Sequence, residues 1–255
     1  MNVESQHDDL SLIGALGATK GVVCLVGAGG KKTTMYALAQ MHPGRVLLSS
    51  TTHMYAYRTD RVDRVVMLAD ATARPPELAS GRVVAMATQT DTAHRVGGVS
   101  AERLEEIHQQ GHFDVCLIKA DGARSRWIKT PGPNEPLILS FATTVIPVVS
   151  AQVLGRPLGT EIAHRPERVG RLLNMKLGDP FEERHLIELL ASPAGSLKGV
   201  GDAAVIPLIN MVDTDEHRER ARRIALAVLE RTPRISRIVL ASMHHTRLVD
   251  VIERG

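Results

Sequence analysis

Short apolar runs rich in β-branched residues recur along the chain, and stretches with helical periodicity separate several of them. Runs of this length and composition predict β-strands. The predicted strands lie near Gly21–Val26, Arg45–Ser50, Arg64–Met67, Arg82–Met86, Asp114–Ala120, Thr143–Val149, Ala203–Ile209 and Ile235–Ala241. Because these runs are nearly continuous in hydrophobicity, both faces of their sheet are expected to be covered. The pattern therefore predicts an α/β fold with a mostly parallel β-sheet and helices on both faces.

Helices are predicted from periodicity and from their capping residues. Lys32–Met41 directly follows the first strand, and Ser100–Gln110 begins with a residue suited to cap a helix. Asp179–Glu182 has the order of a helix start, with Asp as N-cap, then Pro, and Glu at the third position. The helix after Asp213 has one apolar stripe, formed by Ala221, Ile224, Ala225, Val228 and Leu229. A last helical stretch is predicted from His244-His245, and no third ligand is fixed there for a metal.

Residues 1–255 are predicted to form a single domain. The segment Lys129–Pro136 is rich in proline and lies between two predicted core strands. We therefore interpret 122–136 as a functional loop rather than a linker. A helical insertion is predicted at about 160–200.

Composition narrows the classes of partner. Aromatic residues make up 3% of the chain, which argues against base stacking on aromatic side chains. The formal net charge of +3 comes without a long basic stripe, so no nucleic-acid partner is expected. Cys24 and Cys116 lie in apolar runs and are expected to be buried free thiols. The polar residues 1–9 do not resemble a signal peptide, and no apolar run approaches the ~20 residues of a membrane span, so we expect a cytoplasmic protein.

The strongest motif is a glycine-rich turn between the first predicted strand and the following helix. Glycines allow backbone N–H groups to surround a phosphate, and the helix N-terminus adds positive partial charge. A lysine can neutralise the outer phosphate oxygens, and a hydroxyl beside it can bind Mg²⁺. We therefore predict a P-loop NTPase-like domain that binds GTP or ATP through Gly27, Ala28, Gly29, Gly30, Lys31, Lys32, Thr33 and Thr34.

The turn departs from the full G-x-x-x-x-G-K-[ST] pattern. If Lys32-Thr33 is the Lys–Thr pair, Lys31 replaces the preceding glycine. If Gly30-Lys31 is the Gly–Lys pair, Lys32 occupies the hydroxyl position and Thr33 must take over its role. The leading glycine is absent in both registers. The sequence leaves open which lysine binds the phosphate, and the alternative is a glycine-rich turn without a ligand.

Further candidates follow other strands. Asp121 ends an apolar strand and could hold Mg²⁺ opposite the hydroxyl of Thr33, although an Asp after a strand is also a common turn former. Thr52 and His53 follow the second strand, where they could meet the γ-phosphate or the attacking water; the alternative for His53 is a surface histidine. The predicted catalytic set is Lys31, Lys32, Thr52, His53 and Asp121, and the predicted metal ligands are Thr33 and Asp121. The residues Arg124, Arg126 and Lys129 could bind anions or be solvated loop charges.

A candidate base-reading turn occurs late in the chain. Asn210-Met211-Val212-Asp213 is similar to the N-K-x-D turn of guanine-binding NTPases, in which the Asp accepts hydrogen bonds from the base. Asn210 and Asp213 are therefore predicted to contact the nucleotide base. The alternative is a turn in which Asp213 or Thr214 caps the next helix.

Taken in order, these motifs resemble the YqeC family. The likeness covers about residues 10–245 and is carried by VGAGGKKTT, STTHM, ADGAR, a loop ending in NEP, HRPE, LKG and N-x-V-D. Members are described as accessory proteins of selenium-dependent molybdenum hydroxylases, and the resemblance implies a P-loop NTPase core similar to the SIMIBI class. It also implies a molybdenum hydroxylase, or its cofactor-maturation proteins, as the partner. Lys119 stands where the family usually has Glu, and Met211 where the base motif usually has Lys.

Three functions follow as alternatives. The first is an NTPase that uses GTP or ATP with Mg²⁺ while a molybdenum hydroxylase matures. The second is a small-molecule kinase or transferase acting on a cofactor precursor or a selenium compound, with the Arg124–Glu135 loop as the wall of an acceptor pocket. The third is a nucleotide-gated chaperone or binding module with little turnover.

Overall fold

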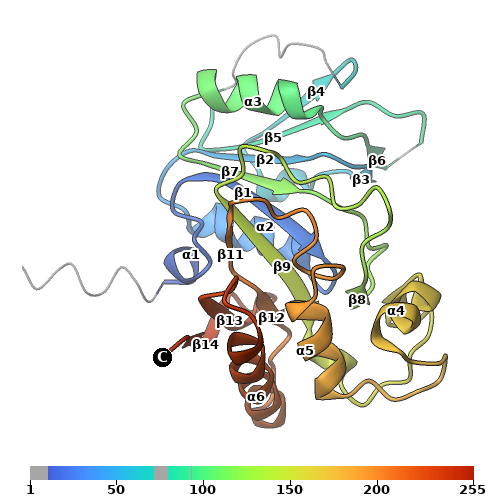
Figure 1. Cartoon of the computed structure of the whole chain (residues 1–255). Coiled ribbons are helices and arrows are strands. Elements are labelled where there is room, and N and C mark those ends of the chain that lie inside the picture. Colours follow the sequence, from blue (N-terminus) through green and yellow to red (C-terminus); the bar gives the residue numbers. More distant parts are fainter. Residues whose placement is uncertain (1–10, 72–79, 93) are drawn as a thin grey trace, which may run out of the picture.

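The central sheet contains ten strands in the computed structural model, which describes residues 11–71, 80–92 and 94–255 (Figure 1). The strands are β1 (Gly21–Gly27), β2 (Val46–Ser50), β4 (Arg64–Leu68), β5 (Val83–Thr88), β7 (Val115–Lys119), β9 (Thr144–Ser150), β11 (Ala204–Val205), β12 (Leu208–Asn210), β13 (Arg237–Ser242) and β14 (Arg247–Glu253). Their order is β14-β13-β12-β9-β1-β7-β2-β5-β4, with β11 paired to β9. Within this sheet only the β13–β14 pair is antiparallel among the described residues. The predicted mostly parallel sheet is confirmed.

Six α-helices and two small sheets surround the central sheet in the described ranges. The helices are α1 (Leu12–Ala15), α2 (Lys31–Met41), α3 (Ala101–Gln110), α4 (Pro166–Leu173), α5 (Glu183–Ala191) and α6 (Asp215–Arg231), with 3₁₀ turns at Thr59–Arg61 and Ala151–Val153. β3 (Met54–Tyr55) pairs antiparallel with β6 (Arg95–Val96), and β8 (Ile128–Lys129) pairs parallel with β10 (Ala163–His164). No helix in these parts of the chain combines the length and apolar character needed to cross a membrane.

Two hydrophobic cores lie on opposite faces of the sheet. Cys24 and Val26 of β1 belong to the core that packs against α3, α4, α5 and α6. Val23 and Leu25 of the same strand belong to the core that packs against α1 and α2. Because helices cover both faces, successive side chains of the strand are all buried, and this explains the uninterrupted apolar runs in the sequence.

Most predicted helices agree with the structure, and two predicted features are wrong. The Ser100 hydroxyl accepts the Arg103 N–H at 3.2 Å, and the predicted apolar stripe of α6 is buried. However, α5 begins at Glu183 with Glu182 as its N-cap, whereas Asp179 accepts the backbone N–H of Lys176 at 2.7 Å. The intervening segment is extended because its buried Phe181 exchanges backbone hydrogen bonds with 155–156.

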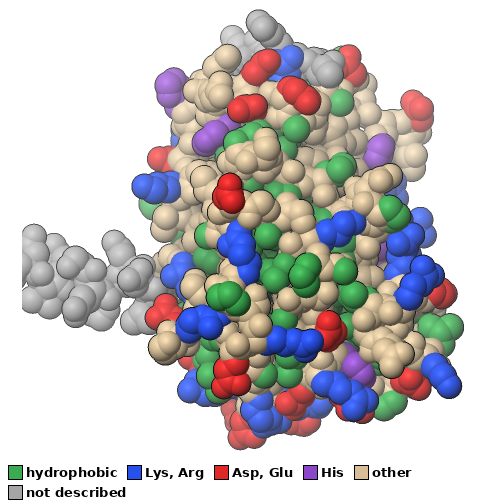
Figure 2. All heavy atoms as spheres, in the orientation of Figure 1, with side chains coloured by type: hydrophobic (Ala, Val, Ile, Leu, Met, Phe, Trp, Pro, Cys, Tyr) green, Lys and Arg blue, Asp and Glu red, His purple; other side chains and the backbone are tan. Residues whose placement is uncertain are grey.

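The second correction concerns the C-terminus. His244-His245 does not begin a helix but lies in the turn between β13 and β14, where the His245 N–H donates to the Ser242 carbonyl at 3.1 Å. The segment that follows, Arg247–Glu253, is short and rich in β-branched residues, and it adds an antiparallel strand at the edge of the sheet. On the face seen in Figure 2, basic and acidic side chains are interspersed.

Candidate functional site

The candidate site lies at the carboxyl ends of the central strands. In open parallel sheets, ligands bind in the crevice outside these strand ends. Buried polar residues gather there at the ends of β2, β7, β9, β12 and β13, namely Ser50, Lys119, Ser150, Asn210 and Ser242. β1 is flanked by β7 and β9, so the glycine-rich turn that follows it lies in the middle of this edge.

Two adjacent residues of the turn have a backbone conformation that requires glycine. Gly29 has a φ of 94° and Gly30 a φ of 120°, a region that residues with a Cβ rarely adopt. A Cβ on Gly30 would also collide with the side-chain amide nitrogen of Asn210. That amide donates to the Gly29 carbonyl at 2.7 Å and fixes the turn from the end of β12, which is separated from β1 by β9.

The backbone N–H groups of the turn divide into two sets. Those of the first half have backbone acceptors. The Ala28 N–H donates to the Val148 carbonyl and the Gly29 N–H donates to the Arg126 carbonyl, each at 2.9 Å. In the second half, the N–H groups of Gly30, Lys31, Lys32 and Thr33 have no acceptor among the described residues. These are the groups that the first turn of a helix leaves unsatisfied, and they carry the positive end of the α2 dipole. The part of the turn open to an anion is therefore residues 30–33.

Lys31 lies folded inside this turn. Its ammonium group is 3.0 Å from the Asp121 carboxylate and also donates to the Gly27 carbonyl, and only 5% of the residue is exposed. Burial lowers the pKa of Lys31, and the charge of Asp121 opposes that shift. Lys31 is thus the lysine that belongs to the turn, whereas Lys32 points out of it.

Asp121 is the centre of a buried charge network. Its carboxylate lies 3.0 Å from Lys129 as well as from Lys31, and it accepts the Gly27 N–H at 2.9 Å. Although burial of the carboxylate acts in the opposite direction, Lys31 and Lys129 hold the pKa of Asp121 below its usual value. Lys129 also binds Glu135 at 2.9 Å. The network joins β1, β7 and the proline-rich loop beneath the glycine-rich turn.

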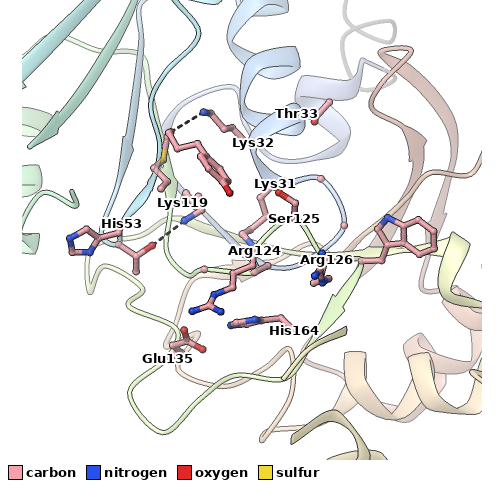
Figure 3. A pocket seen from close by; sticks show the side chains of 18 of the residues that line it. Lys31, Lys32, Thr33, His53, Lys119, Arg124, Ser125, Arg126, Glu135 and His164 are labelled. Atoms are coloured by element: carbon pink, nitrogen blue, oxygen red, sulfur yellow. Dashed lines mark hydrogen bonds between the residues drawn. The ribbon is translucent and has the colours of Figure 1, made fainter. Parts of the chain in front are cut away.

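Two further lysines extend toward the open side of the turn (Figure 3). Lys32 donates to the carbonyl of Tyr55 at 3.0 Å, and Lys119 donates to the Thr52 hydroxyl at 3.0 Å. Burial, with help from the nearby Arg58, lowers the pKa of Lys32 to about 8. Burial, followed by the charge of Lys31, lowers the pKa of Lys119 to about 8. Both lysines line the same cavity as residues 30–33, and their ammonium groups are held by uncharged acceptors.

Lys31, Lys32 and Lys119 line a cavity of about 560 Å³. Seven Lys and Arg residues and one acidic residue contribute to its wall: Lys31, Lys32, Lys119, Arg95, Arg124, Arg126, Arg165 and Glu135. Gly29, Gly30, Thr33, Thr52, His53, Trp127, His164 and Met211 are also among the lining residues. A cavity with this balance of charge favours an anionic ligand.

The predicted hydroxyl and imidazole groups are distributed unevenly around this cavity. Thr33 is exposed and lines the cavity, whereas Thr34 is fully buried and donates to the Gly30 carbonyl at 3.1 Å. Thr52 lines the wall through its contact with Lys119, and the exposed His53 lies beside it. Gly27, Ala28, Thr34 and Asp121 lie behind this wall and do not line the cavity.

Mg²⁺ is the metal that a P-loop implies, and it takes oxygen ligands in a near-octahedral arrangement. The carboxylate of Asp121 is already bound by Lys31, Lys129 and the Gly27 N–H, and it does not line the cavity. The described residues contain no group of three or more His, Cys, Asp or Glu that could hold a metal ion. The residues present do not fit a protein-held Mg²⁺, and ligation by Thr33 and Asp121 stays a prediction.

Asn210 and Asp213, the predicted base-reading residues, form hydrogen bonds with other residues of the protein. Asn210 joins the Gly29 carbonyl to the Met243 N–H, which donates to its side-chain oxygen at 2.9 Å. Asp213 accepts from the Ser242 hydroxyl at 2.5 Å and from Gln152 at 3.2 Å, but it remains exposed. Thr214, not Asp213, caps α6. Met211 is the residue of this turn that lines the cavity.

Sequence reasoning missed part of the opposite wall. Trp127, His164 and Arg165 line the cavity because β8 pairs with β10, and strands of two residues leave no readable pattern. The available signal was the succession Arg124-Ser125-Arg126-Trp127 followed by the motif His164–Glu167.

Comparisons with known proteins give the chain's family. The family model for the YqeC protein matches residues 23–167, which include the glycine-rich turn, Asp121 and His164. The uncharacterized protein YqeC of Escherichia coli (strain K12) is 30% identical over 204 residues, which cover 78% of this chain and 79% of that protein. The chain belongs to the YqeC family.

Proposed function

We propose that this protein binds a nucleoside triphosphate in the cavity at residues 30–33 and acts as a P-loop NTPase. One observation carries the proposal: four unsatisfied backbone N–H groups lie at a helix N-terminus beside Lys31, Lys32 and Lys119. N–H groups arranged in this way bind phosphate oxygens, and the lysines neutralise their charge.

The contribution of each lysine follows from its present partners. Lys31 would exchange the Gly27 carbonyl for a phosphate oxygen and keep its ion pair with Asp121. Lys32 and Lys119 would exchange uncharged acceptors for an anion, which makes stronger hydrogen bonds. Positioning and charge neutralisation would therefore supply the catalysis, as in other phosphoryl-transfer sites.

The proposal is tested by calorimetric titration with GTP and with ATP. Lys31→Met should weaken binding by about tenfold or more, because a charged hydrogen-bond donor is lost. Lys176→Met is the matched control, since Lys176 is exposed and does not line the cavity. Equal affinities of the wild type and the Lys31 variant would contradict the proposal.

We propose GTP as the preferred nucleotide, with the base near Met211 and Asp213. Each oxygen of the Asp213 carboxylate has one partner in the structure and can accept a second hydrogen bond. Paired donors such as those on guanine are worth about 1–3 kcal/mol of discrimination. GTP should therefore bind several-fold more tightly than ATP, and Asp213→Ala should abolish the difference. Equal affinity in the wild type would leave ATP as the ligand to pursue.

The proposed biological role, assisting the maturation of a selenium-dependent molybdenum hydroxylase, rests on the family resemblance alone. In cells that produce such a hydroxylase, the enzyme should contain a smaller amount of active cofactor when this protein is absent. The Lys31→Met variant should fail to restore hydroxylase activity and the Lys176→Met control should restore it. Full activity without the protein would refute this role.

A further inference from the structure

The cavity has a second cationic wall opposite the glycine-rich turn. Arg124 and Arg126 come from the loop after β7, and His164 and Arg165 come from the end of β10 and the start of α4. Figure 3 shows Arg124, Arg126 and His164 directed into the space across from Lys31 and Lys119. We call this set the arginine wall.

Two guanidinium groups of this wall, those of Arg124 and Arg126, have no partner among the described residues. The side chains of Arg124 and Arg126 make no hydrogen bond or ion pair with any residue in the described part of the chain. Arg165 lies 3.6 Å from Glu135, but that carboxylate is already bound by Lys129 at 2.9 Å. Burial, with the charges of Lys129 and Arg165, lowers the pKa of His164, so its neutral ring adds hydrogen-bonding capacity rather than another charge.

The backbone holds these side chains in a costly arrangement. Arg124, Ser125 and Arg165 have φ values of 46°, 59° and 57°, and none is a glycine. A non-glycine residue in this region is strained, and such residues cluster at ligand sites. The surrounding contacts impose the arrangement, since the Gly29 N–H donates to the Arg126 carbonyl and the Trp127 N–H to the Ile162 carbonyl, each at 2.9 Å.

The two walls belong to different structural units. The lysines come from α2 and β7, whereas the loop of Arg124 and Arg126 is linked to His164 and Arg165 by the β8–β10 pair. The positive side chains of the cavity also outnumber the negative charges of a single triphosphate. One nucleotide bound at residues 30–33 would leave Arg124 and Arg126 without a counter-charge.

We propose that the arginine wall is a second anion subsite, which binds a phosphate- or carboxylate-bearing small molecule beside the nucleotide. Planar guanidinium groups match both anions with paired hydrogen bonds. The inference rests on the proposed nucleotide site for its second ligand, and it favours the kinase or transferase alternative, in which an acceptor must lie close to the phosphates.

Titration with inorganic phosphate tests the subsite independently of the nucleotide. Wild-type protein should show two classes of phosphate site, and the Arg124→Gln/Arg126→Gln double variant should lose one of them, with affinity there falling about tenfold or more. Lys31→Met should lose the other. The Arg168→Gln/Arg171→Gln variant is the matched control because both arginines lie on α4 but do not line the cavity. The exposed Arg165 gives a second variant, Arg165→Gln, should the double variant fold poorly.

The outcomes separate the two proposals. If the Arg124/Arg126 variant loses a phosphate site and the wild type binds no GTP, the subsite is supported and the nucleotide site is refuted. Phosphate binding unchanged in both arginine variants would overturn the subsite. In protein saturated with a non-hydrolysable GTP analogue, titration with phosphate and with acetate should distinguish the preferred anion. Absence of any binding by either anion would also overturn it.

Discussion

Replacing Asp121 by asparagine is expected to lower the free energy of unfolding by about 3 kcal/mol, because it leaves a buried lysine without its counter-charge. Asp121 is 1% exposed and contacts both Lys31 and Lys129 at 3.0 Å. Asparagine can still accept the Gly27 N–H, so the change removes mainly the charge.

The magnitude follows from what each lysine retains. Lys129 keeps Glu135 at 2.9 Å and the Gly122 carbonyl at 2.8 Å. Lys31 keeps only the Gly27 carbonyl, and burial already disfavours its charged form. Removal of one partner from a buried pair costs about 3–5 kcal/mol, and the lower end is expected because Lys31 can release its proton. A loss of this size is a large fraction of the stability of a typical domain.

Urea unfolding at neutral pH, followed by circular dichroism, measures the effect. The Lys31→Met/Asp121→Asn double variant should be more stable than Asp121→Asn alone, since the unpaired charge is removed. Asp60→Asn is the control. In the described part of the chain Asp60 forms only exposed ion pairs, so the change should leave the unfolding midpoint unchanged. A midpoint for Asp121→Asn equal to that of the control would refute this account of the network.

The sign of the pH dependence is fixed by the same contacts. The pKa of Asp121 is lowered in the folded state. Its stabilising contribution is therefore present above the pKa of an unfolded Asp, about 3.9, and is lost as the pH falls through the lower folded value. The stability difference between the wild type and Asp121→Asn should therefore shrink as the pH falls below about pH 4.

Two further predictions concern the lysines of the cavity. Because the pKa values of Lys32 and Lys119 are about 8, the affinity for an anion should fall as the pH rises from 7 to 9, by up to about tenfold per lysine. In calorimetric titrations, Lys119→Met should bind the anion more weakly than the wild type at pH 7, and its affinity should decline less steeply with pH. The wild type should also bind nucleotide measurably in the presence of EDTA, with an affinity reduced by less than about tenfold relative to Mg²⁺ buffer. Lys119→Glu should make nucleotide binding depend strongly on Mg²⁺. Loss of all wild-type binding in EDTA would show that the lysines do not replace the metal.

The sequence was sufficient to predict the sheet and the edge of the sheet at which the candidate residues meet. Strands such as β1 and β7 are buried on both faces, so their sequences are apolar without alternation and easy to recognise. In a parallel sheet, residues that follow such strands meet at one edge, and this brings the glycine-rich turn, Thr52 and Asp121 together. The short-range signals for Ser100 and α6 also held because their capping contacts are local.

The partners within the site could not be predicted, since they depend on contacts distant in sequence. Asp121 looked like a metal ligand because it ends an apolar strand in a chain that also contains a glycine-rich turn. The structure brings Lys31 to it from α2 and Lys129 from beyond the Arg124–Arg126 turn. Asn210 looked like a base contact, yet its amide reaches past the one intervening strand, β9, to the Gly29 carbonyl. A polar residue at a strand end can face the ligand or the turn that holds it, and the pattern is the same in both cases.

The two positions at which the chain departs from the expected motifs alter the site in the same direction. In the register that the fold selects, with Lys31 inside the turn, Lys32 occupies the position of the hydroxyl that binds a metal. Lys119 ends β7 where the family resemblance leads one to expect an acid, and its ammonium group reaches the Thr52 hydroxyl on the cavity wall. Each change removes a ligand for a cation and adds a cation. With Asp121 held by two lysines, the cavity has little capacity to bind Mg²⁺ itself and a large capacity to bind an anion, so charge neutralisation there falls to side chains.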